Sequence, residues 1–234
     1  MQVHEQVRTA KTGRKFLEVH TERVVRLEDA GRRPPCTPRT ARCYSTPFPF
    51  QRTRACCRAH NVTVLGDVAA ALDDAGVPWW IDYGTLLGYQ VNGGFYWNDK
   101  DTDIGVLATH RDVVLELMQH WRSLGRYVHY KAPSGDRWRG GDRVKVRLSA
   151  VNHNNCDIFF WEQREDGLLH RANYIQVDRF KGREFPPDWV LPLQRGRWEG
   201  IDVSVPAQPE KLVAHRYGDG WRELPAARTD GVRR

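Results

Sequence analysis

Three aspartates spaced two residues apart, Asp99, Asp101 and Asp103, lead directly into the apolar segment 104–107. In a β-strand, residues two apart point to the same face, so we expect these carboxylates to crowd along one edge. Crowding of like charges is costly unless a cation lies between them. A hard divalent cation is the usual solution, because Mg²⁺, or Mn²⁺ in its place, binds carboxylate and phosphate oxygens together.

A further carboxylate, Asp157, is the single acid of the apolar run 156–161. Its burial is expensive unless it is ionised against a metal or another cation. If its strand lies beside the strand of Asp103, the sequence predicts a metal-binding triad of Asp101, Asp103 and Asp157. A solvated acidic turn without a catalytic role is the alternative.

Two other groups of residues are candidates for binding substrate. Gly84 and Thr85, with Tyr83 before them, precede a predicted short helix, where backbone N–H groups form an anion site. Lys145 and Arg147 alternate on a predicted strand next to that of Asp157, where they either reach phosphates or lie on a solvated face. A phosphate cradle, a D-x-D pair and a later aspartate indicate metal-assisted phosphoryl or nucleotidyl transfer.

The periodicity of apolar residues predicts an α+β fold. Helical spacing begins near Asn61 and is ended by Gly76 and Pro78. Further helices are expected over 84–91, 113–124 and 210–217, and strands over 77–82, 102–107, 126–130, 144–149 and 155–161. We therefore expect one domain over 61–225, a basic extension over 1–33 and a flexible tail over 226–234. Apolar residues from Phe16 to Leu27 indicate an amphipathic helix within the extension.

Four of the five cysteines lie in the segment 34–60, whose five prolines exclude a long helix. A loop without a core of its own needs a cross-link, and four thiolates can hold one tetrahedral Zn²⁺. The spacing leaves disulfide bonds or free thiols open as alternatives. The candidate zinc ligands are Cys36, Cys43, Cys56 and Cys57, whereas Cys156 is expected to be a buried, inert thiol.

The net charge of +7 favours an anionic partner, although a solvated surface explains it equally well. A basic, zinc-stabilised nucleic-acid-binding module is therefore a possible class, but the acidic cluster would repel a phosphate backbone, so no nucleic acid is expected. No apolar stretch approaches the roughly 18 residues of a membrane helix, and no secretory signal is visible. The cytoplasm is the expected location on these grounds.

Several motifs in order resemble the LicD/fukutin family, over about residues 61–225. These are G-T-L-L-G at 84–88, D-K-D-T-D-I-G-V at 99–106, D-I-F at 157–159, W-E-G-I-D-V at 198–203 and Y-G-D at 217–219. This chain departs from many members at Gln90, where they have arginine, and at Asn98, where they have tryptophan.

The resemblance implies a nucleotidyltransferase-like mixed sheet flanked by helices. It also implies Mg²⁺-dependent transfer of a phospho-alcohol from a CDP-linked donor to a hydroxyl of a glycan or cell-surface polymer. Its metal-binding carboxylates match Asp101, Asp103 and Asp157, with Asp99 as an additional catalytic one, and its phosphate-facing turn matches Gly84 and Thr85. Transfer of a nucleotidyl group from a nucleoside triphosphate is the alternative reaction.

Similarity to the fukutin-related members implies three further points. The transferred group is expected to be ribitol phosphate, with phosphocholine and glycerol phosphate as alternatives. A similar cysteine pattern in those members implies that a structural Zn²⁺ pins the loop through the four cysteines of 34–60. Animal members work in the Golgi lumen behind a membrane anchor, which is the alternative location.

Overall fold

A six-stranded mixed sheet organises the chain in this computed structural model. The structure describes residues 6–9, 15–19, 23–26, 36–40, 55–96, 99–131, 142–172 and 184–223, the first three ranges as backbone only. Cys43, the Gly-rich segment before Asp142 and the expected tail over 226–234 lie outside these ranges.

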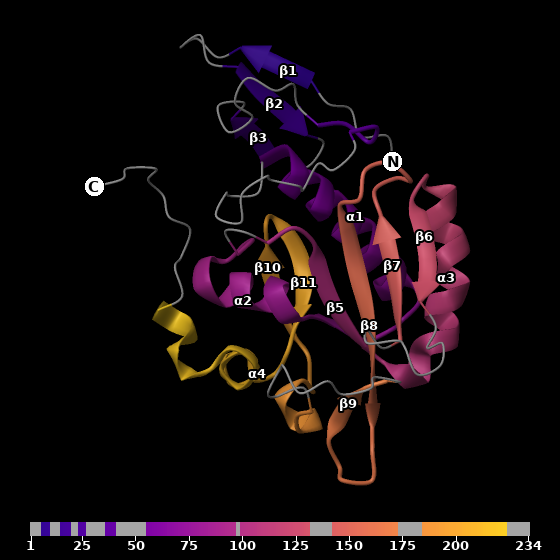
Figure 1. Cartoon of the computed structure of the whole chain (residues 1–234), viewed down its shortest axis with the longest axis vertical. Helices are drawn as coiled ribbons and strands as arrows, with labels where there is room; N and C mark the ends of the chain where they lie inside the picture. Colours follow the sequence, from indigo (N-terminus) through magenta and orange to yellow (C-terminus); the bar gives the residue numbers. More distant parts are fainter. Residues whose placement is uncertain are drawn as a thin grey trace.

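The strands follow the order β4-β5-β8-β7-β6, with β9 beside β8. Figure 1 shows β5, β8, β7 and β6 in this order. β5 and β8 are parallel, and the other pairs are antiparallel. This confirms the expected α+β fold with a mixed sheet flanked by helices. The strands are β4 (Trp79–Ile81), β5 (Thr102–Leu107), β6 (Tyr127–Lys131), β7 (Arg143–Arg147), β8 (Asn155–Gln163) and β9 (Leu169–Arg171).

The two faces of the sheet differ because side chains alternate along each strand. On one face, Ile104, Ile158 and Val144 are fully buried beneath two helices. One of these helices packs against β7 and β8 and the other against β6. The opposite face carries the charged residues of β5, β7 and β8, so it is the face on which a site can form. The helices are α1 (Ala55–Asp74), α2 (Tyr83–Asn92), α3 (Arg111–Ser123) and α4 (Pro209–Tyr217), with short turns η2 (Ala108–His110), η4 (Pro187–Trp189) and η5 (Asp219–Glu223). The two that cover the apolar face are α1 and α3.

The start of α1 differs from the expected domain start at Asn61. The helix already begins at Ala55, so Cys56 and Cys57 lie on its first turn rather than in an irregular loop. α1 is buried on nearly all sides, because α3, β8 and the hairpin of β10 and β11 all contact it. A helix surrounded in this way has apolar residues all round, which hides its N-terminal boundary from a periodicity argument.

Two small antiparallel sheets lie beside the main one. β10 (Gln194–Trp198) and β11 (Ile201–Val205) form a hairpin whose turn residues Glu199 and Gly200 both have positive φ, as a type I′ turn requires. The expected amphipathic helix between Phe16 and Leu27 is wrong. That region instead forms a meander of β1 (Gln6–Thr9), β2 (Lys15–Val19) and β3 (Arg23–Arg26) (Figure 1), in keeping with the β-propensity of its valines.

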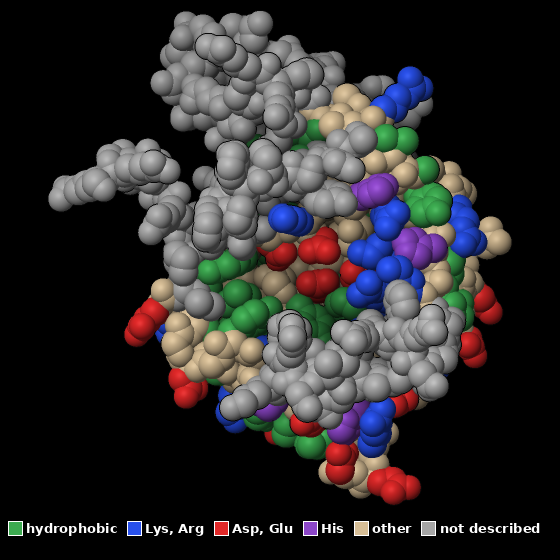
Figure 2. All heavy atoms as spheres, viewed as in Figure 1, with side chains coloured by type: hydrophobic (Ala, Val, Ile, Leu, Met, Phe, Trp, Pro, Cys, Tyr) green, Lys and Arg blue, Asp and Glu red, His purple; other side chains and the backbone are tan. Residues whose placement is uncertain are grey.

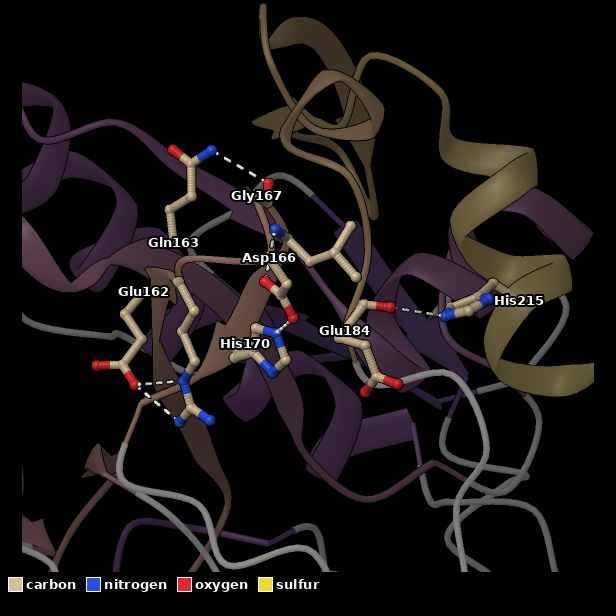
Figure 3. A network of polar contacts seen from close by, with 9 residues as sticks. Glu162, Gln163, Asp166, Gly167, His170, Glu184 and His215 are labelled. Atoms are coloured by element: carbon tan, nitrogen blue, oxygen red, sulfur yellow. Dashed lines mark hydrogen bonds and ion pairs between the residues drawn. The ribbon is translucent and has the colours of Figure 1, made fainter.

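A polar hairpin joins β8 to β9 (Figure 3). At its tip, His170 Nε2 lies 2.7 Å from Asp166 Oδ2, and Gln163 Nε2 donates to the carbonyl of Gly167 at 3.1 Å. Elsewhere in the same view, His215 of α4 is 2.8 Å from the carbonyl oxygen of Glu184, which ties α4 to the segment before η4.

None of the helices within the described ranges combines the length and the apolar character needed to cross a bilayer.

Close contact between β4 and β5 gives the first prediction. A Cβ atom at Gly105 would come within 3.0 Å of the indole of Trp80, which is fully buried and has no room to move. We expect Gly105→Ala to lower the free energy of unfolding by ~1–3 kcal/mol, the usual cost of overpacking. Thermal and urea denaturation measure it.

The matched control is Gly66→Ala in α1, where nothing lies within 4 Å of the new Cβ atom. Alanine in a helix interior is better than glycine by about 0.5–1 kcal/mol, so this variant should be stabilised. Equal effects of the two substitutions would contradict the proposed register of β4 and β5.

Candidate metal and phosphate site

The acidic residues meet where β5 and β8 run side by side. Asp103 of β5 and Asp157 of β8 are register partners across the parallel pair, so their side chains point to the same face. One carboxylate oxygen from each of Asp101, Asp103 and Asp157 lies within 4.8 Å of the others. Figure 2 shows acidic side chains gathered in a hollow of this face.

The spacing predicted that all three acids lie on one strand, and this prediction is wrong. β5 begins at Thr102, so Asp99 and Asp101 belong to the segment that enters the strand. Both nevertheless lie close to Asp103. Their negative charges therefore contribute to raising the pKa of Asp103. The adjacency of the strands of Asp103 and Asp157, on which the predicted triad depended, is confirmed.

The turn from β4 into α2 clamps Asp103 in place. Asp82 N–H donates to the carbonyl of Asp103 at 2.9 Å, and the Thr85 hydroxyl accepts from the N–H of Asp103 at 2.8 Å. Between these two residues, Gly84 lies against Asp99, and a Cβ atom at Gly84 would come within 3.0 Å of that carboxylate. The glycine is therefore required for Asp99 to occupy its position.

Burial and mutual repulsion disfavour ionisation of the cluster. Burial, followed by the charge of Asp101, raises the pKa of Asp99 to about 7. Burial and the charge of Asp157 raise the pKa of Asp101. Burial and four neighbouring carboxylates, Asp101 first, hold the pKa of Asp103 well above its usual range. A divalent cation would reverse all three shifts, because it favours the ionised carboxylates.

Positive charge comes from β7, on the other side of β8. Lys145 Nζ donates to Asp157 Oδ2 at 2.8 Å, and Arg143 Nη1 lies 3.9 Å from the same oxygen. Lys145 is thus the cation that pairs with the buried acid. Arg147 shares the face of Lys145 but lies opposite Asn155, with its guanidinium 5.7 Å from the ring centroid of Tyr127.

The row of residues across the sheet runs Asp103, Asp157, Lys145 and His129. Along this row the side chains change from acidic on β5 and β8 to basic on β7 and β6. Figure 2 shows basic side chains to the right of the acidic cluster. Burial, followed by the charge of Arg147, lowers the pKa of His129 to about 4, so this imidazole is neutral at pH 7.

Sequence reasoning missed Arg143, Arg171 and Arg216. The alternation from Arg143 through Lys145 places Arg143 on the same face, so that signal was present. Arg171 Nη1 donates to the hydroxyl of Tyr83 at 2.9 Å, and Arg216 of α4 forms a buried ion pair with Asp82. No spacing rule connects either residue with the turn that it contacts.

The acidic residues fit a hard divalent cation. The second oxygen of Asp157, Oδ1, is buried and has no hydrogen-bond partner within the described ranges. An uncompensated carboxylate oxygen is costly in a protein interior, and it faces a set of ligands made of oxygen atoms alone. That donor set suits Mg²⁺ or Mn²⁺ better than a thiophilic metal.

Three of the four expected zinc ligands lie together. The Sγ atoms of Cys36, Cys56 and Cys57 are within 4.8 Å of one another, and Cys43 lies outside the described residues. Cys36 and Cys56 are joined as a disulfide, whereas the sulfurs of Cys36 and Cys57 are 3.7 Å apart. Two thiolates on one tetrahedral zinc are about 3.8 Å apart, so the group accommodates either cross-link. Cys156 is fully buried, and burial raises the pKa of its thiol.

Comparisons with known proteins place the acidic residues of the site, from Asp99 to Asp157, within a recognised domain. A family profile described as "LicD/FKTN/FKRP, nucleotidyltransferase domain" matches residues 76–208. The chain is 24% identical over 198 residues to the mouse protein named "Ribitol 5-phosphate transferase FKRP", which covers 81% of this chain and 39% of that protein. It is also 24% identical over 157 residues to mouse "Ribitol-5-phosphate transferase FKTN", covering 66% of this chain and 31% of that protein.

This chain therefore spans less than half the length of these two relatives. Among solved structures, the crystal structure of ANT(2″)-Ia in complex with adenylyl-2″-tobramycin is similar with a TM-score of 0.39 and 16% identity, over 62% of this chain and 68% of that chain.

Repulsion within the acidic cluster gives the second prediction. For a carboxyl whose pKa is raised from 3.8 to about 7, as for Asp99, the folded state binds more protons than the unfolded state between these values. Without divalent cations, the free energy of unfolding should therefore fall as pH rises from about 4 to about 7. Millimolar Mn²⁺ should restore stability most strongly at the upper end. Thermal melts across this range measure both effects.

Asp103→Asn tests the cause, because it removes one repelling charge. We expect this variant to be more stable than the parent at pH 8 without metal, by ~1 kcal/mol or about 2–4 °C in Tm, and to lose its response to Mn²⁺. Asp74→Asn, at the exposed end of α1, is the control and should change neither property. A metal-free Tm that does not depend on pH would refute the account of the cluster.

Proposed function

Because the chain belongs to the LicD/FKTN/FKRP family of nucleotidyltransferase domains, we propose that it transfers a phospho-alcohol from a CDP-linked donor to a hydroxyl of a glycan or related polymer. Ribitol phosphate is the favoured group, since relatives matching most of this chain are named as ribitol 5-phosphate transferases. The observation that carries the proposal is the convergence of Asp101, Asp103 and Asp157 within the matched residues, beside the cation of Lys145.

The three aspartates would hold Mg²⁺ or Mn²⁺, which, when bound, neutralises negative charge on the phosphate oxygens of the donor. Lys145 and Arg143 lie beside Asp157 on β7 and would bind further phosphate oxygens. Arg147, farther along β7, would extend this binding surface.

The other end of the site would be formed by Tyr83, Gly84 and Thr85. These residues begin α2, and the N-terminus of a helix favours an anion. Thr85 uses its hydroxyl as an acceptor for the N–H of Asp103, so we assign it mainly to orienting that acid, and Gly84 to the close approach of a phosphate.

In the proposed reaction, the acceptor hydroxyl oxygen attacks the phosphorus that bears the alcohol. A new P–O bond forms, the bond between this phosphorus and the bridging oxygen breaks, and CMP leaves with that oxygen. Asp99 would take the proton of the hydroxyl, because it belongs to the cluster but is not one of the three aspartates whose carboxylate oxygens converge as metal ligands.

We further propose that Cys36, Cys56, Cys57 and Cys43 hold a structural Zn²⁺. Cys36 N–H donates to the sulfur of Cys56 at 3.4 Å, so the backbone of the loop that carries Cys36 approaches the sulfur atoms at the start of α1. The loop that carries Cys36 also contacts the connection between β7 and β8, since Asn152 Nδ2 donates to the carbonyl of Thr37 at 2.8 Å. A zinc ion there would fix the start of α1 to the strands that carry Lys145 and Asp157.

The third prediction concerns the donor. We test CDP-ribitol, CDP-glycerol, CDP-choline, CTP and ATP. Among these five ligands we expect CDP-ribitol to raise the Tm, and to do so only when Mg²⁺ is present. A ligand at 100 times its Kd adds about 2.7 kcal/mol of stability, which is readily measured. Asp101→Asn should abolish the shift, and Asp74→Asn should leave it intact.

Product analysis with the stabilising ligand separates the two reactions. Release of CMP supports phospho-alcohol transfer, whereas release of pyrophosphate from CTP or ATP would replace it with nucleotidyl transfer. A folded protein whose Tm responds to none of the five ligands would refute the proposal.

The fourth prediction concerns zinc. Protein purified under reducing conditions should contain about one zinc per chain by elemental analysis, and Cys57→Ser should lose the metal and melt at a lower temperature. Cys156→Ser is the control for thiol loss and should keep its zinc. Zinc-free protein in which Cys57→Ser leaves the Tm unchanged would favour the disulfide of Cys36 and Cys56 as the cross-link.

A further inference from the structure

Helix α4 reaches the site through Arg216, which lies beyond the residues matched by the family profile. The side chain of Arg216 is 5% exposed and that of Asp82 is fully buried, and the two form an ion pair. α4 is also anchored to the segment before η4, because His215, the neighbour of Arg216, contacts the carbonyl oxygen of Glu184 (Figure 3). Arg216 is therefore presented to the turn by an anchored element.

The turn that Arg216 contacts has an unusual backbone. Tyr83 has a φ of 41°, a left-handed conformation that side chains other than glycine rarely adopt. Such residues persist only when their surroundings hold them. The guanidinium of Arg216 lies 4.0 Å from the ring centroid of Tyr83, and Arg171 donates to the hydroxyl of the same ring at 2.9 Å. Two arginines thus hold this ring from its face and from its tip.

The turn transmits this restraint to the acids residue by residue. Asp82, the partner of Arg216, donates its N–H to Asp103 O, and Thr85 accepts from Asp103 N. Gly84, between them, is in contact range of Asp99. Both peptide groups that flank Asp103, and the position of Asp99, therefore depend on the conformation of the turn that Arg216 holds.

We propose that Arg216 is a positioning residue for the acidic site: by pairing with Asp82 and covering Tyr83, it keeps residues 82–85 in the conformation that places Asp99 and Asp103 for metal and substrate. This inference rests on the proposed function, because that proposal assigns a metal to Asp103 and a contact with substrate to Asp99. It extends the functional unit beyond residue 208 into α4.

Electrostatics alone predicts the opposite effect, which makes the inference testable. Arg216 is a cation near the acids, so its removal should strengthen the binding of a divalent cation if it acts only through charge. If it acts by positioning, its removal should weaken that binding.

The experiment measures Mn²⁺ affinity of the full chain by isothermal titration calorimetry, with circular dichroism as the test of folding. We expect Arg216→Gln to weaken Mn²⁺ binding by about tenfold and Arg216→Lys to recover part of it, since lysine keeps the charge but not the flat face over Tyr83. Arg222→Gln is the matched control, because Arg222 also pairs with a carboxylate and stacks on an aromatic ring but is 60% exposed. It should bind Mn²⁺ as the parent does.

Loss of Arg216 leaves the buried Asp82 unpaired, so Arg216→Gln could unfold the chain. The double variant Asp82→Asn with Arg216→Gln removes both charges and keeps the question open to measurement; it should fold and still bind Mn²⁺ more weakly than the parent. Unchanged or tighter Mn²⁺ binding in a folded variant of Arg216 would overturn the inference and leave the proposed function standing. Absence of Mn²⁺ binding by the parent itself would overturn both.

Discussion

Repulsion between carboxylates is the constraint on which the rest of this structure depends. The register of β5 and β8 sets Asp103 beside Asp157, and the segment before β5 adds Asp99 and Asp101. The sheet can hold such a group only because Lys145 stands opposite Asp157 and because the backbone of Asp103 is fixed on both sides. Repulsion between the carboxylates lowers the free energy of unfolding, and a divalent cation bound among them would remove this destabilisation.

The charged face of the sheet is organised as two halves. Acids occupy β5 and β8, and bases occupy β7 and β6, so charge changes sign along a single row of residues. A metal bound to one half and phosphate oxygens bound to the other would each be neutralised by the protein and by each other. This complementarity would allow an acidic centre to serve the anionic donor that we propose.

The sequence allowed the local elements to be predicted better than the contacts between them. The strand over 102–107 was predicted from its apolar residues. The acid in the strand over 155–161 was predicted to bind a cation, because a lone charge in an apolar run must be compensated. The start of α1 was missed, since a helix buried on nearly all sides has little polar face to mark it. The contact of Arg216 with Asp82 was also beyond reach, because it joins distant segments and no periodic pattern relates them. Within the N-terminal extension, β-propensity outweighed the apparent helical spacing.

The parallel pairing of β5 with β8 has a consequence for how the protein folds. Antiparallel neighbours such as β6 and β7 can form from segments close in sequence, whereas the connection that leads from β5 to β8 contains α3, β6 and β7. Closing so long a connection costs chain entropy before any contact repays it, which places this step late in folding. Because Asp103 and Asp157 sit on these two strands, partly folded chains lack the assembled acidic site. The ability to capture a divalent cation should accordingly emerge with the native state and serve as a reporter of its completion.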